Sequence, residues 1–323
     1  MGSSASSRRS YDDSGWALLA IAFLIITALE LRRPLPIEPR SVIPFLTACT
    51  PLATASYFYQ RIRLREDLAA VATGLLQILS FSALGCVLQY LLAREGGEMW
   101  SGTLLGWDQA LGLDWRAMAT RMNGQHWLYW AFGLAYKALI PQAVAIAVLL
   151  GWQGRLLELR TYILAGMICG GTSILLSSMM PAVDCSVYLG LSQSTLPNLD
   201  FNISYAAAVE LDALRTGKLT LIKLSEMQGI VTFPSYHAGL ASASCWASLK
   251  NGSRWVGFLG ALMAIATIVS APIRGGHYFI DIVFGIAIGG ASVFAATRLV
   301  GLQTLGLPLR ALPFRRSHEA FAR

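Results

Sequence analysis

Long apolar stretches with almost no charged side chains constrain the fold of this chain more than any other feature. About twenty such residues, at ~1.5 Å per helical residue, cover the ~30 Å hydrocarbon core of a bilayer. Because that core offers backbone groups no water, each stretch is expected to be a helix. We therefore predict an all-α, polytopic membrane helix bundle, with spans at about 16–31, 41–60, 68–92, 127–151, 161–181, 236–250, 255–272 and 277–298.

The charge composition supports a membrane location. Of the 323 residues, 55% are hydrophobic and only 13% are charged, roughly half the charged fraction of a soluble domain. The net charge of +7 comes from basic residues at the ends of apolar runs, such as Arg61 and Arg155. There they contact headgroups, so membrane lipids, and not nucleic acid, are the predicted partner. The five cysteines form no CxxC pair and are expected to be small apolar fillers.

The order of apolar and polar segments predicts four regions. Residues 1–15 are Ser-rich and expected to be disordered, 16–92 hold N-terminal transmembrane helices, 93–300 form the main membrane domain, and 301–323 are a cytoplasmic tail. Two long polar connections fall at about 93–126 and 184–233. Counting Lys and Arg in each connection places the termini inside and both long connections outside. The sequence does not indicate an oligomeric state.

His277 opens the last apolar span and is followed four residues later by Asp281. At that spacing both side chains share one helix face, so the carboxylate would orient the imidazole as in a nucleophile or base pair. Gly275 and Gly276 allow close backbone approach, and the free N–H groups of the helix N-terminus favour an anion. Arg274 adds a planar charged fork suited to phosphate. The alternative is a satisfied His–Asp pair that follows a tight turn.

His237 lies in the first turn of an earlier span, after Pro234 and Ser235. Ser235 is a plausible N-cap, and His237 could be an interfacial residue without a role. The functional interpretation makes Ser235 a phosphate ligand and His237 the acid that protonates a leaving alcohol, a task suited to its near-neutral pKa. Two such histidines on one membrane side predict displacement at phosphorus through a phosphohistidine at His277.

The sequence resembles the type 2 phosphatidic acid phosphatase superfamily, closest to the branch of inositol phosphorylceramide synthases and their bacterial relatives. Its PSGH motif corresponds to Pro234-Ser235-Tyr236-His237, and SRxxxxxHxxxD to Ser270 through Asp281. The resemblance implies a six-helix phosphatase-type core with about two extra N-terminal helices. It also implies a metal-independent lipid phosphatase or phosphotransferase in a bacterial-type inner membrane, with the active site on the periplasmic face and no cofactor.

The motifs also depart from the family pattern. Tyr236 replaces a glycine, Ala271 replaces the expected arginine, and the KxxxxxxRP motif is absent. The segment Tyr136 to Gln142 resembles the inositol-phosphotransferase-like branch, with Lys137 as a candidate phosphate contact. Lys137 could instead extend its side chain to the membrane interface.

Three other functions stay open at this point. One is a transporter that uses the same polar cluster, and a second is a catalytically impaired family member that has lost phosphate-binding residues. A third is a metal site formed by His237, His277 and Asp281, which the neighbouring positive charge of Arg274 disfavours. The sequence does not show whether the reaction is hydrolysis or transfer, or which lipid phosphate and acceptor take part.

Overall fold

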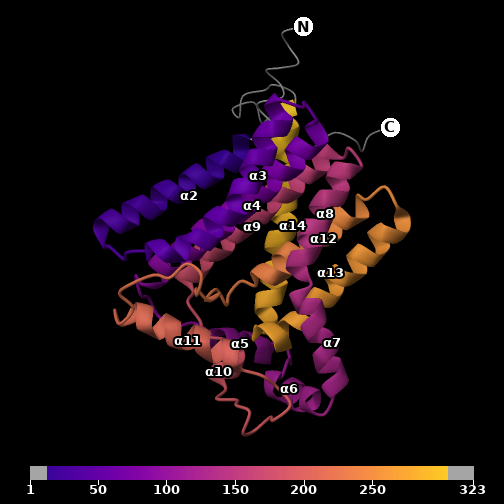
Figure 1. The fold of residues 1–323 in the computed structure, drawn as a ribbon. Helices are drawn as coiled ribbons and strands as arrows, with labels where there is room; N and C mark the ends of the chain where they lie inside the picture. The colour runs from indigo at the N-terminus through magenta and orange to yellow at the C-terminus, as the bar shows by residue number, and fades with distance from the viewer. Residues whose placement is uncertain (1–12, 305–323) are drawn as a thin grey trace, which may run out of the picture.

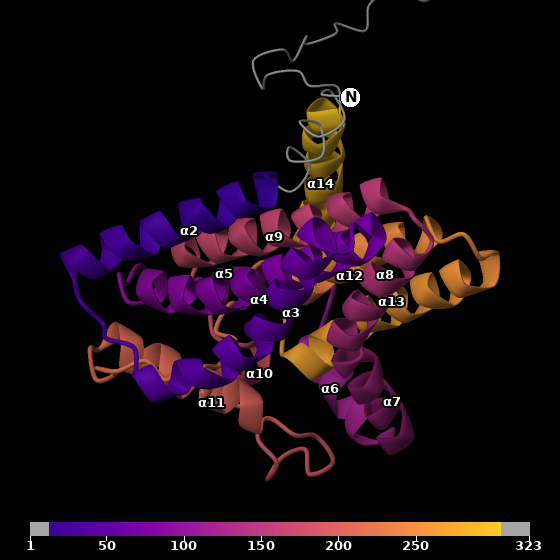
Figure 2. The same cartoon turned by 45° about the horizontal axis from the view of Figure 1, so that its top comes forward.

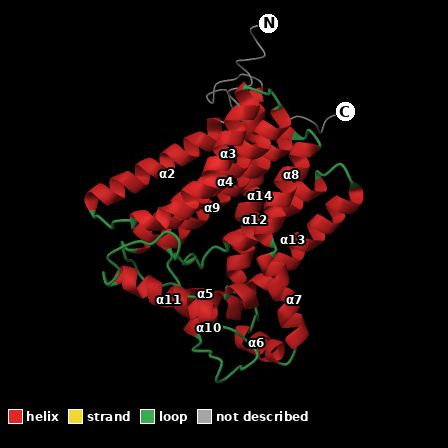
Figure 3. Ribbon diagram, in the orientation of Figure 1, coloured by secondary structure: helices red, strands yellow, loops and turns green. Residues whose placement is uncertain are grey.

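The computed structural model describes residues 13–304, which are helical apart from loops and an isolated bridge between Ile37 and Ile222 (Figure 3). Within this part of the chain, six helices are long and apolar enough to cross a membrane. This confirms the predicted polytopic helix bundle. The six are α2 (Asp13–Arg32), α3 (Ile43–Arg61), α4 (Glu66–Ala93), α9 (Leu156–Met179), α13 (Arg254–Gly275) and α14 (Phe279–Thr304).

Two predicted spans differ from a single crossing helix. The stretch predicted at 127–151 is divided into α7 (His126–Lys137) and α8 (Leu139–Trp152), which meet at an angle of 44°. Pro141 has no N–H to donate to the carbonyl of Lys137, four residues earlier, so an unbroken helix is disfavoured there. The span predicted at 236–250 is α12 (Tyr236–Leu249), whose 14 residues are fewer than a full crossing needs.

The N-terminal helices pack on the outside of the bundle. The helix α3 lies mainly against α4, and α2 packs against α4 and α9. Figure 2 shows α2, α4 and α9 running alongside one another, with α3 near the viewer. The main apolar core lies between α8, α9, α12 and α14 and includes Leu150, Tyr162 and Ala243. Residues 1–12 and 305–323 lie outside the described part of the chain. They include most of the N-terminal segment predicted to be disordered and most of the predicted cytoplasmic tail.

The two long polar connections fold into short helices at one end of the bundle. The first contains α5 (Ser101–Ala110) and α6 (Trp115–Asn123), and the second contains α10 (Cys185–Tyr188) and α11 (Asn202–Arg215). In Figure 1 all four lie below the end of the bundle at which α12 and α14 begin. The helix starts that bear His237 and His277 therefore share one end, covered by the same layer.

Glycines allow α14 to cross α12 with the two backbones in contact. A Cβ atom on Gly285 would lie 2.4 Å from the carbonyl oxygen of Ser235, and one on Gly289 would lie 2.3 Å from that of Gly239. No side chain fits at such distances, so the crossing depends on glycine at these positions. The contact sets the start of α12 directly beside the start of α14.

Candidate active site

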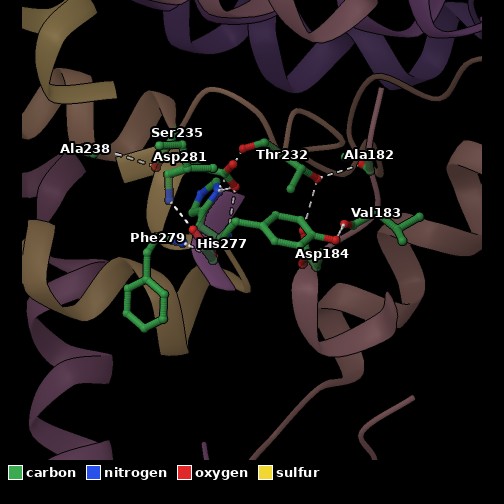
Figure 4. Close-up of polar contacts among 12 residues, drawn as sticks. Ala182, Val183, Asp184, Thr232, Ser235, Ala238, His277, Phe279 and Asp281 are labelled. Atoms are coloured by element: carbon green, nitrogen blue, oxygen red, sulfur yellow. Dashed lines mark hydrogen bonds and ion pairs between the residues drawn. The ribbon is translucent and has the colours of Figure 1, made fainter. Parts of the chain in front are cut away.

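His277 lies in the short link between α13 and α14 and is only 4% exposed. Its Nδ1 is 2.9 Å from the carbonyl oxygen of Thr232 and 3.3 Å from Oδ2 of Asp281 (Figure 4). The sequence predicted the Asp281 contact from the spacing of four residues. The Thr232 contact comes from the second polar connection, 45 residues earlier, and no sequence pattern pointed to it.

The partners of Nδ1 determine where the proton of His277 resides. A backbone carbonyl oxygen can only accept a hydrogen bond, so Nδ1 carries the proton and donates it toward Thr232 and Asp281. The neutral ring therefore presents Nε2 with its lone pair. Burial alone would depress the pKa of His277, but the hydrogen bond and charge of Asp281, together with the charge of Asp184 and the Thr232 carbonyl, raise it above its ordinary value.

The first N–H groups of α14 are occupied by carboxylates, and this corrects one expectation. Oδ2 of Asp281 accepts from the backbone nitrogen of Tyr278 at 2.9 Å. The carboxylate of Asp108, a fully buried residue on α5, accepts from Phe279 and Ile280 at 2.8 Å each. These three amides are therefore not free to bind a phosphate. The sequence could not show this, because Asp108 lies about 170 residues before its partners in the chain.

The turn before His277 is fixed by contacts from both polar connections. The indole Nε1 of Trp115 donates to the carbonyl oxygen of His277 at 3.0 Å, and the backbone nitrogen of Cys185 donates to that of Gly276 at 2.7 Å. Gly276 has φ of 68° and ends α13 in the left-handed conformation. A Cβ there would lie 2.5 Å from Asp184, so both the backbone conformation and the space require glycine.

Asp184 is a carboxyl group of the site that belongs to none of the sequence motifs. Its Oδ1 is 3.2 Å from the hydroxyl of Thr232, which also donates to the carbonyl oxygen of Ala182 at 2.9 Å. Burial raises the pKa of Asp184, and hydrogen bonds and the charge of His277 oppose that shift. The sequence showed Asp184 only as one of several polar residues in a connection.

His237 faces this arrangement from the first turn of α12. Its ring stacks on that of Tyr136 from α7, with centroids 4.3 Å apart and planes 15° apart. The ring centroid of His277 is 6.5 Å away. The preceding Ser235 is fully buried, and its hydroxyl accepts from the backbone nitrogen of Ala238 at 3.3 Å, the N-cap contact of α12. Its phosphate-binding role stays a prediction.

The two predicted basic phosphate contacts are placed differently. The guanidinium of Arg274 lies over the ring of Tyr129, 4.1 Å from its centroid, three residues before His277. Lys137 is exposed at the bend between α7 and α8, where the described side chains offer it no hydrogen bond or ion pair. It is Tyr136, its neighbour, that faces the histidines. The geometry of Lys137 therefore fits the interfacial alternative better.

No set of three histidine, cysteine, aspartate or glutamate side chains within residues 13–304 is arranged to hold a metal ion. His237, His277 and Asp281 are not such a set: Asp281 contacts Nδ1 of His277, and the rings of the two histidines lie 6.5 Å apart between centroids. The arrangement instead has the parts of a histidine nucleophile with an oriented ring, and a second histidine across from it.

Comparison with protein families agrees with this geometry. A family model described as the PAP2 superfamily matches residues 102–295, more than half of the chain and all of the site described above. The chain belongs to the PAP2 superfamily. Membership confirms the superfamily inferred from the sequence motifs and supports phosphatase-type phosphoesterase activity in general. The match does not separate the inositol phosphorylceramide-synthase-like branch from the rest of the PAP2 superfamily. No curated protein and no solved structure matches the chain significantly.

Proposed function

We propose that this multi-pass membrane protein is a phosphoesterase or phosphotransferase that acts on a lipid phosphate through a phosphohistidine at His277. One observation carries the proposal. Nδ1 of His277 is held by two acceptors, so the buried ring offers Nε2 as a nucleophile, and the ring of His237 lies 6.5 Å away between centroids. Membership of a phosphatase-type superfamily supports the choice of phosphorus as the centre attacked.

The reaction follows in two steps. Nε2 of His277 attacks phosphorus, the bond from phosphorus to the alcohol oxygen breaks, and His237, which this step requires in its protonated form, gives its proton to that oxygen and becomes neutral. In the second step water or an acceptor alcohol loses its proton to His237 and attacks phosphorus, which breaks the phosphorus–nitrogen bond and restores both histidines. Asp281 and Thr232 stabilise the positive charge that His277 acquires, because both accept from its Nδ1.

The phosphate is expected to meet Arg274 first, because the described residues give its guanidinium no carboxylate partner. A bacterial-type inner membrane with the site on its periplasmic face is the location we propose, from the distribution of Lys and Arg around the spans. A transfer reaction onto a lipid alcohol is supported by the Tyr136 to Gln142 segment. Gln142, the last residue of that segment, has a structural contact: its side chain donates to the carbonyl oxygen of Gly260 at 2.6 Å and so joins α8 to α13.

The test uses purified protein in detergent with phosphatidic acid, isoprenyl diphosphate, or phosphatidylinositol with a ceramide or diacylglycerol acceptor. Free phosphate would show hydrolysis, and a new phospholipid without free phosphate would show transfer. His277→Ala is expected to abolish either product and the acid-labile phosphoprotein found after rapid quenching. His237→Ala is expected to slow an alcohol leaving group more than a nitrophenol. His126→Ala, at an exposed histidine outside the site, is the matched control. Full activity of His277→Ala would refute the mechanism.

A further inference from the structure

One face of α7 lines the site with aromatic rings. Tyr129, Gly133 and Tyr136 are spaced by four and three residues and so share this face. The guanidinium of Arg274 lies over Tyr129, and a Cβ on Gly133 would be 3.1 Å from its Cζ. The glycine thus leaves room for the arginine to lie flat along the helix. One turn further, Tyr136 supports His237 in the same way.

The hydroxyl of Tyr136 lies beside the reactive edge of His277. A Cβ on Gly275 would be 2.6 Å from this hydroxyl and 2.8 Å from Cδ2 of His277, so the two atoms meet in the space that the glycine leaves. Cδ2 is bonded to Nε2, the nitrogen that attacks phosphorus. The Tyr136 hydroxyl is therefore next to the position at which a phosphoryl group on Nε2 must sit.

This hydroxyl has no hydrogen-bond partner among the described residues, although its ring is largely enclosed. It is not one of the fully enclosed polar atoms that lack a partner, so it borders space that a small ligand can reach. Tyr129 and Tyr278, by contrast, donate to the carbonyl oxygens of Asp200 and Val183. The donor of Tyr136 is thus available to a group bound beside His277.

We propose that Tyr136 is a phosphate-binding residue of this site, whose hydroxyl donates to a non-bridging oxygen of the phosphoryl group carried by His277. The proposal rests on the function proposed above and adds a residue to it. The ring of Tyr136 has a second task, which is to hold the imidazole of His237 in position by stacking.

Two substitutions separate the tasks of Tyr136. Tyr136→Phe keeps the stacked ring and removes only the donor, so kcat is expected to fall about 100-fold, as for loss of one oxyanion donor. The fall should be equal for phosphatidic acid and 4-nitrophenyl phosphate. Tyr136→Leu also removes the stacking surface, so phosphatidic acid, whose alcohol needs protonation by His237, should lose more than the nitrophenyl ester. Tyr57→Phe, on the exposed surface of α3, is the control and should keep the wild-type rates.

The outcomes separate this inference from the function on which it rests. Wild-type kcat in Tyr136→Phe, with His277→Ala inactive, would overturn the role of Tyr136 and leave the proposed function intact. Equal activity of wild type and His277→Ala would refute the function itself. If Tyr136→Phe does not fold, Gly275→Ala gives a second reading: its methyl group meets both the hydroxyl and Cδ2 of His277, so a loss of kcat is expected from either contact and only an undiminished kcat is decisive. Undiminished kcat in Gly275→Ala would also count against the proposal.

Discussion

The buried carboxylate of Asp108 gives a direct test of how the start of α14 is held. Its two oxygens accept from the backbone nitrogens of Phe279 and Ile280 at 2.8 Å each, and none of its surface is exposed. Hydrogen bonds to a charged group contribute about 1.5–3 kcal/mol each, so Asp108→Ala should lower the free energy of unfolding by about 3–6 kcal/mol. Asp108→Asn should cost about half as much, because its single carbonyl oxygen can still accept one bond.

The assay is unfolding of the purified protein in mixed detergent–SDS micelles, followed by tryptophan fluorescence, with the rate on phosphatidic acid measured in parallel. Asp114→Ala is the matched control: Asp114 caps α6 by accepting from Ala117 at 3.0 Å, but its surroundings are exposed. Loss of such a cap costs about 1 kcal/mol. If Asp108→Ala costs no more than Asp114→Ala, the carboxylate does not hold α14 as described.

Two further predictions concern the charge around His277 and the helix crossing beneath it. Asp184→Asn removes a charge that helps to raise the pKa of His277. Because Nε2 attacks only when unprotonated, kcat/KM falls as the pH drops through that pKa. The variant should therefore move the acidic side of the pH profile of kcat/KM to lower pH. An unchanged profile would show that Asp184 is already neutral. Gly289→Ala should destabilise the protein by about 1–3 kcal/mol, because its methyl group meets the carbonyl oxygen of Gly239. Gly290→Ala, with nothing within 4 Å, should be neutral or stabilising in the same unfolding assay.

The helices were the part of the fold that the length and low charge of the apolar stretches could predict. Each apolar stretch must form a helix in a bilayer, and every predicted span corresponds to a helix or to the bent pair α7 and α8. The bend does not follow from apolar length, because residues 127–151 are together long and apolar enough for one span; it follows from Pro141, which has no backbone N–H to donate. The short helices α5, α6, α10 and α11 were missed because they lie in polar connections without a strong apolar pattern.

In the site, too, contacts between residues close in the sequence could be predicted, and contacts between distant residues could not. The relation of His277 to Asp281 follows from a spacing of four residues and needs no tertiary information. The contacts of Thr232, Asp108 and Trp115 with the same turn come from segments 45 to 172 residues away, and no local pattern encodes them. Tyr136 stood in the sequence beside Lys137, and only the direction in which each side chain points shows that the tyrosine is the one at the site.

The shortness of α12 bears on the hydration of the reacting phosphate. Its 14 residues extend about 21 Å, well short of the ~30 Å hydrocarbon thickness. The start of α12, which bears His237, lies at the end of the bundle that α5, α6, α10 and α11 cover (Figure 1). Under the proposed function, a phosphate at His237 would therefore lie beneath this layer of short helices and not in bulk water. The access of water through this layer would then decide how far water competes with a bilayer-dissolved alcohol as the acceptor, and hence the balance between hydrolysis and transfer.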